Sequence, residues 1–149
     1  MTKDNQAFIN SILKGAQDAH KKYGVFSSVT IAQAILESGW GKISINNNLF
    51  GIKADSSWKG KKSLVDTHEA HQVRRIPVKA WFRNYMSLDA SILDHALFLA
   101  SNPRYKPAFL CKNGCDFAKA IAKAGYATDP NYADLLISII QHNNLERYD

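Results

Sequence analysis

The residues best suited to chemistry lie at positions 32–41, which read AQAILESGWG. An apolar stretch with helical spacing ends there in one carboxylate, Glu37. The C-terminal end of a helix disfavours an ionised carboxylate, and so does burial among apolar side chains. Both effects favour the protonated form that a general acid needs. Two glycines let the backbone approach a ligand closely, and Trp40 offers a flat face for a sugar ring. We therefore predict that Glu37 is the acid of a carbohydrate-cleaving enzyme.

A structural explanation of Glu37 stays open at this stage. The stretch before it is apolar almost all round the expected helix, which is typical of a buried helix, and Ser27 or Ser28 is expected to cap its start. An unpaired carboxylate in such a place is costly. Glu37 could therefore pair with an arginine elsewhere in the chain, or accept hydrogen bonds from backbone amides.

Residues 46–53, NNNLFGIK, are expected to form a turn-rich segment with exposed amides. Asparagine side chains such as that of Asn48 can hydrogen-bond the hydroxyl and acetamido groups of sugars, but they also simply make turns. Phe50 and Ile52 are expected to anchor this segment on the core.

Residues 54–86 change character, because 61–70 and 78–85 alternate apolar and polar side chains. This pattern predicts a β-hairpin with Pro77 near the start of the return strand. A single hairpin must lean on other elements, so it would form one wall of a groove whose other wall is the helix that carries Glu37.

The hairpin also supplies a second candidate carboxylate, Glu69. It lies 32 positions after Glu37, so any pairing between the two must be tertiary. The alternative is an exposed strand glutamate matched to Arg74 or Arg75. A zinc site at His68 and His71 is discounted, since a spacing of three does not place both side chains on one face of a strand.

Helical spacing predicts further helices. They are expected at 5–22, closed by Gly24; at 88–100, capped by Ser87; at 117–124, capped by Asp116; and from Pro130 onward, capped by Asp129. The prolines at 103 and 107 predict a loop between the second and third of these. Asp94 and His95 are neighbours on one helix and therefore point in different directions, which argues against a catalytic dyad.

Composition limits the class of protein. The chain has 149 residues, 46% of them apolar and 21% charged, which suits one globular domain. No apolar run approaches the roughly 20 residues of a membrane span, and no signal peptide is recognisable at the N-terminus. The net charge of +6 suits an anionic partner such as a cell wall, or a basic face without any dedicated partner. Because the lysine cluster around Gly60 lacks interleaved aromatic residues, nucleic acid is not expected as a partner.

The two cysteines, Cys111 and Cys115, are too few for a structural zinc site without histidines. They could form a local disulfide or remain free thiols.

A set of short motifs occurs in one characteristic order along the chain. They are ESGWG at 37–41, NNLFGIK at 47–53, Thr67-x-Glu69, FRNY at 82–85, Asp94-His95, Arg104-Tyr105 and AGYATDPNYA at 124–133. Together they resemble the glucosaminidase domains of bacterial autolysins and phage lysins, glycoside hydrolase family 73. The resemblance covers nearly the whole chain.

The resemblance implies a mostly helical α+β fold of the lysozyme-like type, in which a helical lobe and a small β-hairpin lobe flank a groove. One glucosaminidase domain would span residues 1–149, with the hairpin lobe of about 54–86 inserted in the helical lobe. The implied activity is cleavage of the N-acetylglucosamine-β-1,4-N-acetylmuramic acid bond of peptidoglycan by an endo-acting enzyme. No cofactor, metal, nucleic acid or membrane insertion is implied, and a monomer is expected.

The resemblance also implies roles for individual residues. Glu37 matches the general acid, Glu69 the second carboxylate, and Tyr126 an aromatic residue whose hydroxyl assists at the acetamido group of the substrate. The substrate-binding positions implied are Trp40, Asn48, Phe50 and Tyr105.

Several alternatives remain at this stage. Carboxylates about 5 Å apart favour a retaining route, and a separation of roughly 6.5–9.5 Å favours an inverting one. In a third route the acetamido oxygen of the substrate attacks and Glu69 orients it. We expect inverting or acetamido-assisted chemistry. A muramidase, a lytic transglycosylase and a catalytically silent wall-binding module are the competing functions. Action on the extracellular wall without a signal peptide would suit delivery by a phage or a domain of a larger secreted protein.

Overall fold

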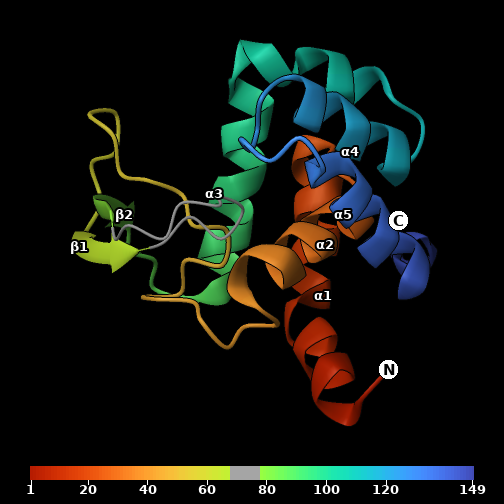
Figure 1. The fold of residues 1–149 in the computed structure, drawn as a ribbon, viewed down its shortest axis with the longest axis horizontal. Coiled ribbons are helices and arrows are strands. Elements are labelled where there is room, and N and C mark those ends of the chain that lie inside the picture. Colours follow the sequence, from red (N-terminus) through yellow and green to blue (C-terminus); the bar gives the residue numbers. More distant parts are fainter. Residues whose placement is uncertain (68–77) are drawn as a thin grey trace.

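The structure is a computed structural model that describes residues 1–67 and 78–149. Helices dominate it, and one antiparallel hairpin stands to one side of them (Figure 1). The elements, in chain order, are α1 (Lys3–Tyr23), α2 (Ser27–Ser38), β1 (Lys62–Thr67), β2 (Val78–Arg83), α3 (Leu88–Ser101), the 3₁₀ helix η1 (Pro103–Leu110), α4 (Gly114–Lys123), α5 (Tyr132–His142) and the 3₁₀ helix η2 (Leu145–Tyr148). The expected mostly helical α+β class is confirmed. Within the described ranges, no helix has the length and apolar character needed to cross a membrane.

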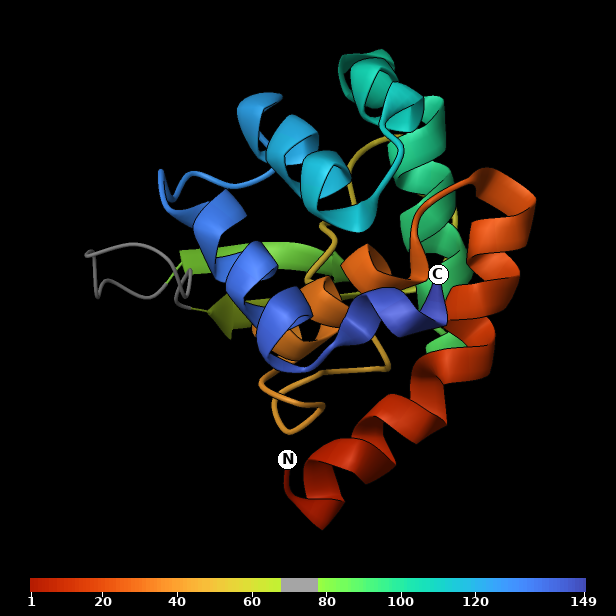
Figure 2. The same cartoon turned by 90° about the vertical axis from the view of Figure 1, so that its right-hand side faces the viewer.

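Helix α2 is the centre of the helical lobe. It contacts α1, α4, α5 and η2, and ten of its twelve residues are buried. Helix α1 packs beside both α2 and α3, as Figure 2 shows. The expectation of a buried helix before Glu37 is confirmed, because neighbours cover its surface on several sides. The end of α1 at Gly24, which has φ +85°, is also confirmed.

The expected serine cap of α2 is wrong. Ser27 and Ser28 both lie inside the helix, and Phe26 at the N-cap position supplies no side-chain hydrogen bond. The backbone N–H and the hydroxyl of Ser28 instead donate to the two carboxylate oxygens of Asp149, each at 2.7 Å. A residue 121 positions away therefore satisfies the start of this helix, which no local pattern could reveal.

Two other helix starts also differ from expectation. Helix α4 begins three residues before Phe117, and Asn113 rather than Asp116 caps it by accepting from the Asp116 N–H. Helix α5 begins at Tyr132, while Asp129 accepts a hydrogen bond from the Asn131 N–H in the turn before it. The expected loop after α3 is a 3₁₀ helix, since its first proline sits at the start, where no N–H is needed.

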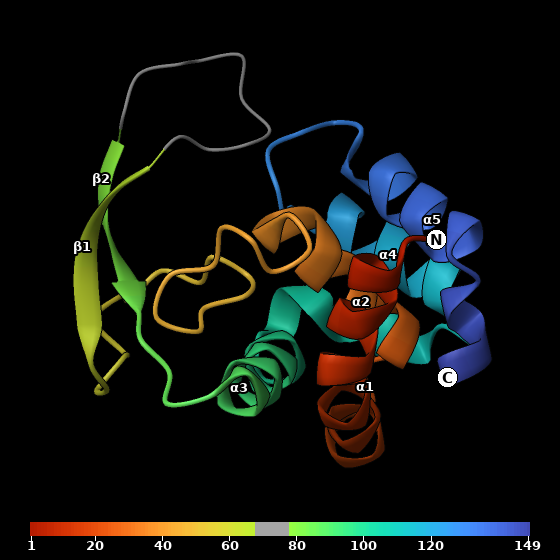
Figure 3. The same cartoon turned by 90° about the horizontal axis from the view of Figure 1, so that it is seen from below.

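The hairpin is confirmed as an antiparallel pair, with Leu64 opposite Trp81 and Val65 opposite Ala80. The segment before β1 pairs with the other edge of β2, because the Ala54 N–H donates to the Trp81 carbonyl at 2.9 Å. Figure 3 shows the hairpin separated from α2 by the loop that follows α2. This loop therefore joins the two lobes.

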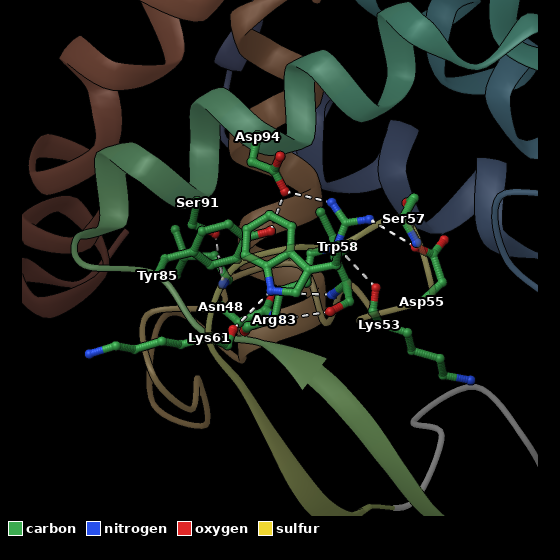
Figure 4. Close-up of polar contacts among 12 residues, drawn as sticks. Asn48, Lys53, Asp55, Ser57, Trp58, Lys61, Arg83, Tyr85, Ser91 and Asp94 are labelled. Atoms are coloured by element: carbon green, nitrogen blue, oxygen red, sulfur yellow. Dashed lines mark hydrogen bonds and ion pairs between the residues drawn. The ribbon is translucent and has the colours of Figure 1, made fainter.

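A buried guanidinium fastens the hairpin to α3 (Figure 4). Arg83 is 7% exposed, and its Nη1 donates to Oδ2 of Asp94 at 2.9 Å. Its Nε donates to the Lys53 carbonyl at 3.1 Å, and its Cζ lies 4.7 Å from the centroid of the Trp58 ring. The Tyr85 hydroxyl donates to the same oxygen of Asp94. These contacts hold the hairpin, the loop and α3 in one arrangement.

Candidate active site

A groove of about 540 Å³ lies between the helical lobe and the hairpin. The C-terminal end of α2, the loop after it, both strands, α3, η1 and the segment after α4 all contribute to its lining. Val65 and Phe82 come from the hairpin, and Glu37 comes from α2 on the opposite side. The expected pairing of these two walls is confirmed. Five of the predicted site residues line the groove, namely Glu37, Asn48, Phe50, Tyr105 and Tyr126.

Glu37 lies half-buried in the last turn of α2. The helix ends directly after it because Gly39 takes a left-handed conformation, with φ +54°, and its N–H bonds the Ile35 carbonyl. The hydroxyl of Tyr132 on α5 donates to Oε1 of Glu37 at 3.2 Å. The Tyr132 phenol is thus a partner of Glu37 that the sequence alternatives, an arginine or backbone amides, did not include; those two alternatives stay predictions.

Tyr126 follows α4 in the AGYATDP segment and faces the same groove. Its ring stacks on that of Tyr132 at 5.6 Å, and the Tyr105 ring lies 6.1 Å away. Burial, and then the nearby Glu37 carboxylate, raise the pKa of Tyr126 well above its usual value of 10.0. The phenol therefore stays protonated and can donate a hydrogen bond to a substrate over the whole working pH range.

Tyr105 and Phe50 place further aromatic surface along the groove. Tyr105, on η1, is 3% exposed, and burial raises the pKa of its hydroxyl. Phe50 is 4% exposed and stacks on the His95 ring, with centroids 3.9 Å apart. The expectation that Phe50 and Ile52 anchor their segment on the core is confirmed by their burial.

Asn48 is buried, and its side chain is engaged in holding the loop. Its amide nitrogen donates to the carbonyls of Ile52 and Arg83 at 2.9 and 3.0 Å, and its oxygen accepts from the Ile52 N–H at 3.1 Å. Both amide hydrogens are thus used within the protein. Asn48 reaches the groove lining, and its contact with a substrate stays a prediction.

Trp40 is the one described candidate that does not lie with the others. It has φ +61°, and its ring packs edge-on against Phe8 of α1, with centroids 6.3 Å apart. It borders a separate hollow with residues of the N-terminus and of the end of α5. The left-handed turn after Glu37 directs the indole toward α1, and the spacing of the motif could not show this.

Glu69 lies outside the described residues, as do His68, His71 and the two arginines proposed as partners of Glu69. Its role as second carboxylate therefore stays a prediction. Among residues 1–67 and 78–149, no cluster of three or more histidine, cysteine, aspartate or glutamate side chains could hold a metal ion. Cys111 and Cys115 are free thiols.

The sequence interpretation missed three residues behind the groove: Tyr132, Gln33 and His95. Gln33 offered a usable signal, because it is polar within an otherwise apolar helix and lies four residues before Glu37, on the same helix face. His95 was considered only as a partner of Asp94. The structure separates the two, since Asp94 bonds Arg83 and Tyr85 while His95 bonds Gln33.

Comparison with known proteins places this arrangement in context. The family model described as "Glucosaminidase: Mannosyl-glycoprotein endo-beta-N-acetylglucosaminidase" matches residues 13–145. The exo-glucosaminidase LytG of Bacillus subtilis is 40% identical over 98% of this chain and 54% of its own length. A probable N-acetylmuramidase of Lactococcus lactis is 36% identical over 99% of this chain and 36% of its own. The glycoside hydrolase domain of Salmonella typhimurium FlgJ superposes with a TM-score of 0.80 at 37% identity, over 95% of this chain and 98% of that one. The chain thus spans about half the length of LytG and about a third of the lactococcal protein.

Proposed function

The chain belongs to the glucosaminidase family of glycoside hydrolases, and from this premise we propose that it cleaves the glycan strand of bacterial peptidoglycan. The bond we assign is the β-1,4 bond on the reducing side of N-acetylglucosamine. One observation carries the proposal: the Glu37 carboxylate lies in the groove between the two lobes, beside the protonated Tyr126. The names of LytG and of the FlgJ domain support a glycosidic bond as the target.

In the proposed reaction Glu37 gives its proton to the glycosidic oxygen while the bond from that oxygen to the anomeric carbon breaks. In one route water forms the new bond at the anomeric carbon. In the other route the acetamido oxygen of the same sugar forms it and closes an oxazolinium ring, and this new bond breaks when water attacks the anomeric carbon. Glu69 removes a proton from that water in the first case and orients the acetamido group in the second. The Tyr126 hydroxyl donates a hydrogen bond to the acetamido group. Both routes need a neutral, proton-bearing Glu37 at the start.

The net charge of +6 supports an anionic cell wall as the partner. Long-range attraction between a basic protein and wall polymers raises the rate of encounter without adding specificity. We accordingly place the action of the chain at the extracellular wall.

The experiment that tests this function identifies the sugar left at the new reducing end. Purified walls are digested, reduced with borohydride, hydrolysed and analysed by mass spectrometry. We expect reduced glucosamine, with fragments of mixed length if cleavage occurs inside the strand. Disaccharides released only from strand ends would instead show the exo mode that the name of LytG states.

The second candidate is a muramidase, which the relative named as a probable N-acetylmuramidase favours. Reduced muramic acid in the same digest would establish this alternative and reject the glucosaminidase. An anhydro sugar would identify a lytic transglycosylase. Wall binding without any new reducing end or anhydro sugar would identify a binding module and reject catalysis.

A further inference from the structure

A chain of buried hydrogen bonds runs from α3 through α2 and α5 to Glu37. Nε2 of His95 lies 2.9 Å from Oε1 of Gln33, and Nε2 of Gln33 lies 3.0 Å from the Tyr132 hydroxyl. That hydroxyl lies 3.2 Å from Oε1 of Glu37. His95, Gln33 and Tyr132 are at most 1% exposed, so water does not compete for the first two bonds.

The chemistry of His95 fixes the direction of the whole chain. Burial lowers the pKa of His95 to about 3, so the ring is neutral and carries one N–H. Its Nδ1 has no hydrogen-bond partner within the described part of the molecule. A buried N–H without an acceptor is rarer in proteins than an acceptor without a donor, so the hydrogen resides on Nε2, where Gln33 accepts it.

This assignment fixes the donor and the acceptor in each of the two hydrogen bonds that follow. Because Oε1 of Gln33 accepts from His95, its amide nitrogen faces Tyr132 and donates to the phenol oxygen. With a donor already pointing at that oxygen, the phenol hydrogen turns to Oε1 of Glu37.

We propose that His95, Gln33 and Tyr132 are positioning residues: they fix the hydrogen bond that the Tyr132 hydroxyl donates to Oε1 of Glu37, and so they orient the carboxyl of the acid in the groove. This inference rests on the proposed role of Glu37 as the general acid. Its consequence is that Gln33, two hydrogen bonds away from the carboxyl, controls the orientation of the acid.

Other titratable groups in the described part of the site must be considered in any pH test. Tyr126 and Tyr105 face the groove with Glu37, and burial raises the pKa of both. Lys53 and Asp55 line it from the loop before β1, and hydrogen bonds from Ser57 lower the pKa of Asp55. Tyr132 packs against Glu37 from α5, and burial raises its pKa as well. The three tyrosines therefore stay protonated, and Asp55 stays ionised, at the pH values where an ordinary carboxylic acid loses its proton.

The first variant is Gln33→Glu, because it exchanges one amide nitrogen for an oxygen at nearly constant shape. In its ionised form the new side chain accepts from both His95 and Tyr132, so the Tyr132 hydrogen turns away from Glu37. Burial favours the neutral form, which can still donate to Tyr132, so the comparison is made at pH values that ionise the new side chain. We expect kcat to fall by about 10- to 100-fold, the scale of losing the orientation of a catalytic group, while KM stays within about twofold. The alkaline limb of the pH–rate profile should move to higher pH, since a hydrogen bond donated to a carboxylate favours its ionised form.

Tyr132→Phe removes the same donor without adding a charge and is the second test. It should lower kcat and move the alkaline limb in the same direction. Adding Gln33→Glu to Tyr132→Phe should cause no further loss of kcat, because both changes interrupt the same series of hydrogen bonds. The matched control is Thr30→Val on α2, the helix that also carries Gln33. This change removes a buried hydroxyl that takes no part in the hydrogen bonds from His95 to Glu37. It should leave kcat and the pH profile unchanged.

A folded Tyr132→Phe protein with wild-type kcat and an unmoved alkaline limb would reject the inference. Losses that multiply in the double variant would reject it too, because Gln33 would then act only through general packing. A different result would reject the proposed function, namely a Glu37→Gln protein that remains active. An inactive Glu37→Gln protein together with wild-type behaviour of the other two variants rejects the positioning chain alone.

Discussion

Replacing the proposed acid by its amide, Glu37→Gln, is expected to lower wall hydrolysis by about 10²- to 10⁴-fold, the usual contribution of a positioned proton donor. The amide keeps the shape of the side chain, and its oxygen can still accept the hydrogen bond from Tyr132. It has no acidic proton to give to a leaving sugar. Release of reducing groups from purified walls measures the loss, and co-sedimentation measures binding, which should persist.

The matched control is Glu146→Gln, the same chemical change at an exposed residue of η2 that does not line the groove. It should retain wild-type turnover. A Glu37→Gln protein that keeps more than about a tenth of the activity would contradict the acid assignment, given the usual size of the effect.

Removing the carboxylate that hydrogen-bonds Arg83, Asp94→Ala, is expected to destabilise the fold by about 3–5 kcal/mol. The side chains of this pair are only 9% and 19% exposed, so the change leaves a buried guanidinium with only a distant, mostly exposed carboxylate, Asp55 at 3.9 Å. It also removes the acceptor of the Tyr85 hydroxyl, whose pKa is raised mainly by burial and then by Asp94. Urea unfolding followed by circular dichroism measures the change.

A second ion pair with the same 2.9 Å distance offers a close control for this effect. Lys14 and Asp18 lie on the surface of α1, with side chains 87% and 56% exposed. Asp18→Ala should cost only about 0.3–0.5 kcal/mol, because water screens an exposed pair. Equal losses in the two variants would show that burial does not govern the strength of the Arg83–Asp94 contact.

Local sequence patterns predicted most of the fold, because local interactions determine those parts of it. The hairpin follows from alternation along 61–70 and 78–85, and the end of α1 follows from one glycine at φ +85°. The start of α2 escaped prediction, since its cap comes from Asp149 at the other end of the chain. No short-range pattern records such a contact.

In the candidate site, too, the features set by local sequence were predicted and those set by distant residues were not. The ESGWG motif correctly predicted that Glu37 would end a buried helix beside a groove, because periodicity and glycine placement are local signals. The Tyr132 hydroxyl that bonds Glu37 comes from 95 positions away, so only the fold reveals it. For Trp40 the residue type alone was misleading about its position. An indole suits a sugar ring, but the backbone turn directs this side chain toward α1.

The most direct test of the central claim is a crystal structure of the Glu37→Gln protein with a peptidoglycan glycan fragment. Our prediction is that the fragment occupies the groove between α2 and the hairpin, with a glycosidic oxygen about 2.6–3.2 Å from the side chain of residue 37. We also expect the acetamido group of the sugar on the non-reducing side of that bond to lie beside Tyr126. A fragment bound on the outer face of the hairpin, where Leu64 and Trp81 are exposed, with no glycosidic oxygen near residue 37, would contradict it.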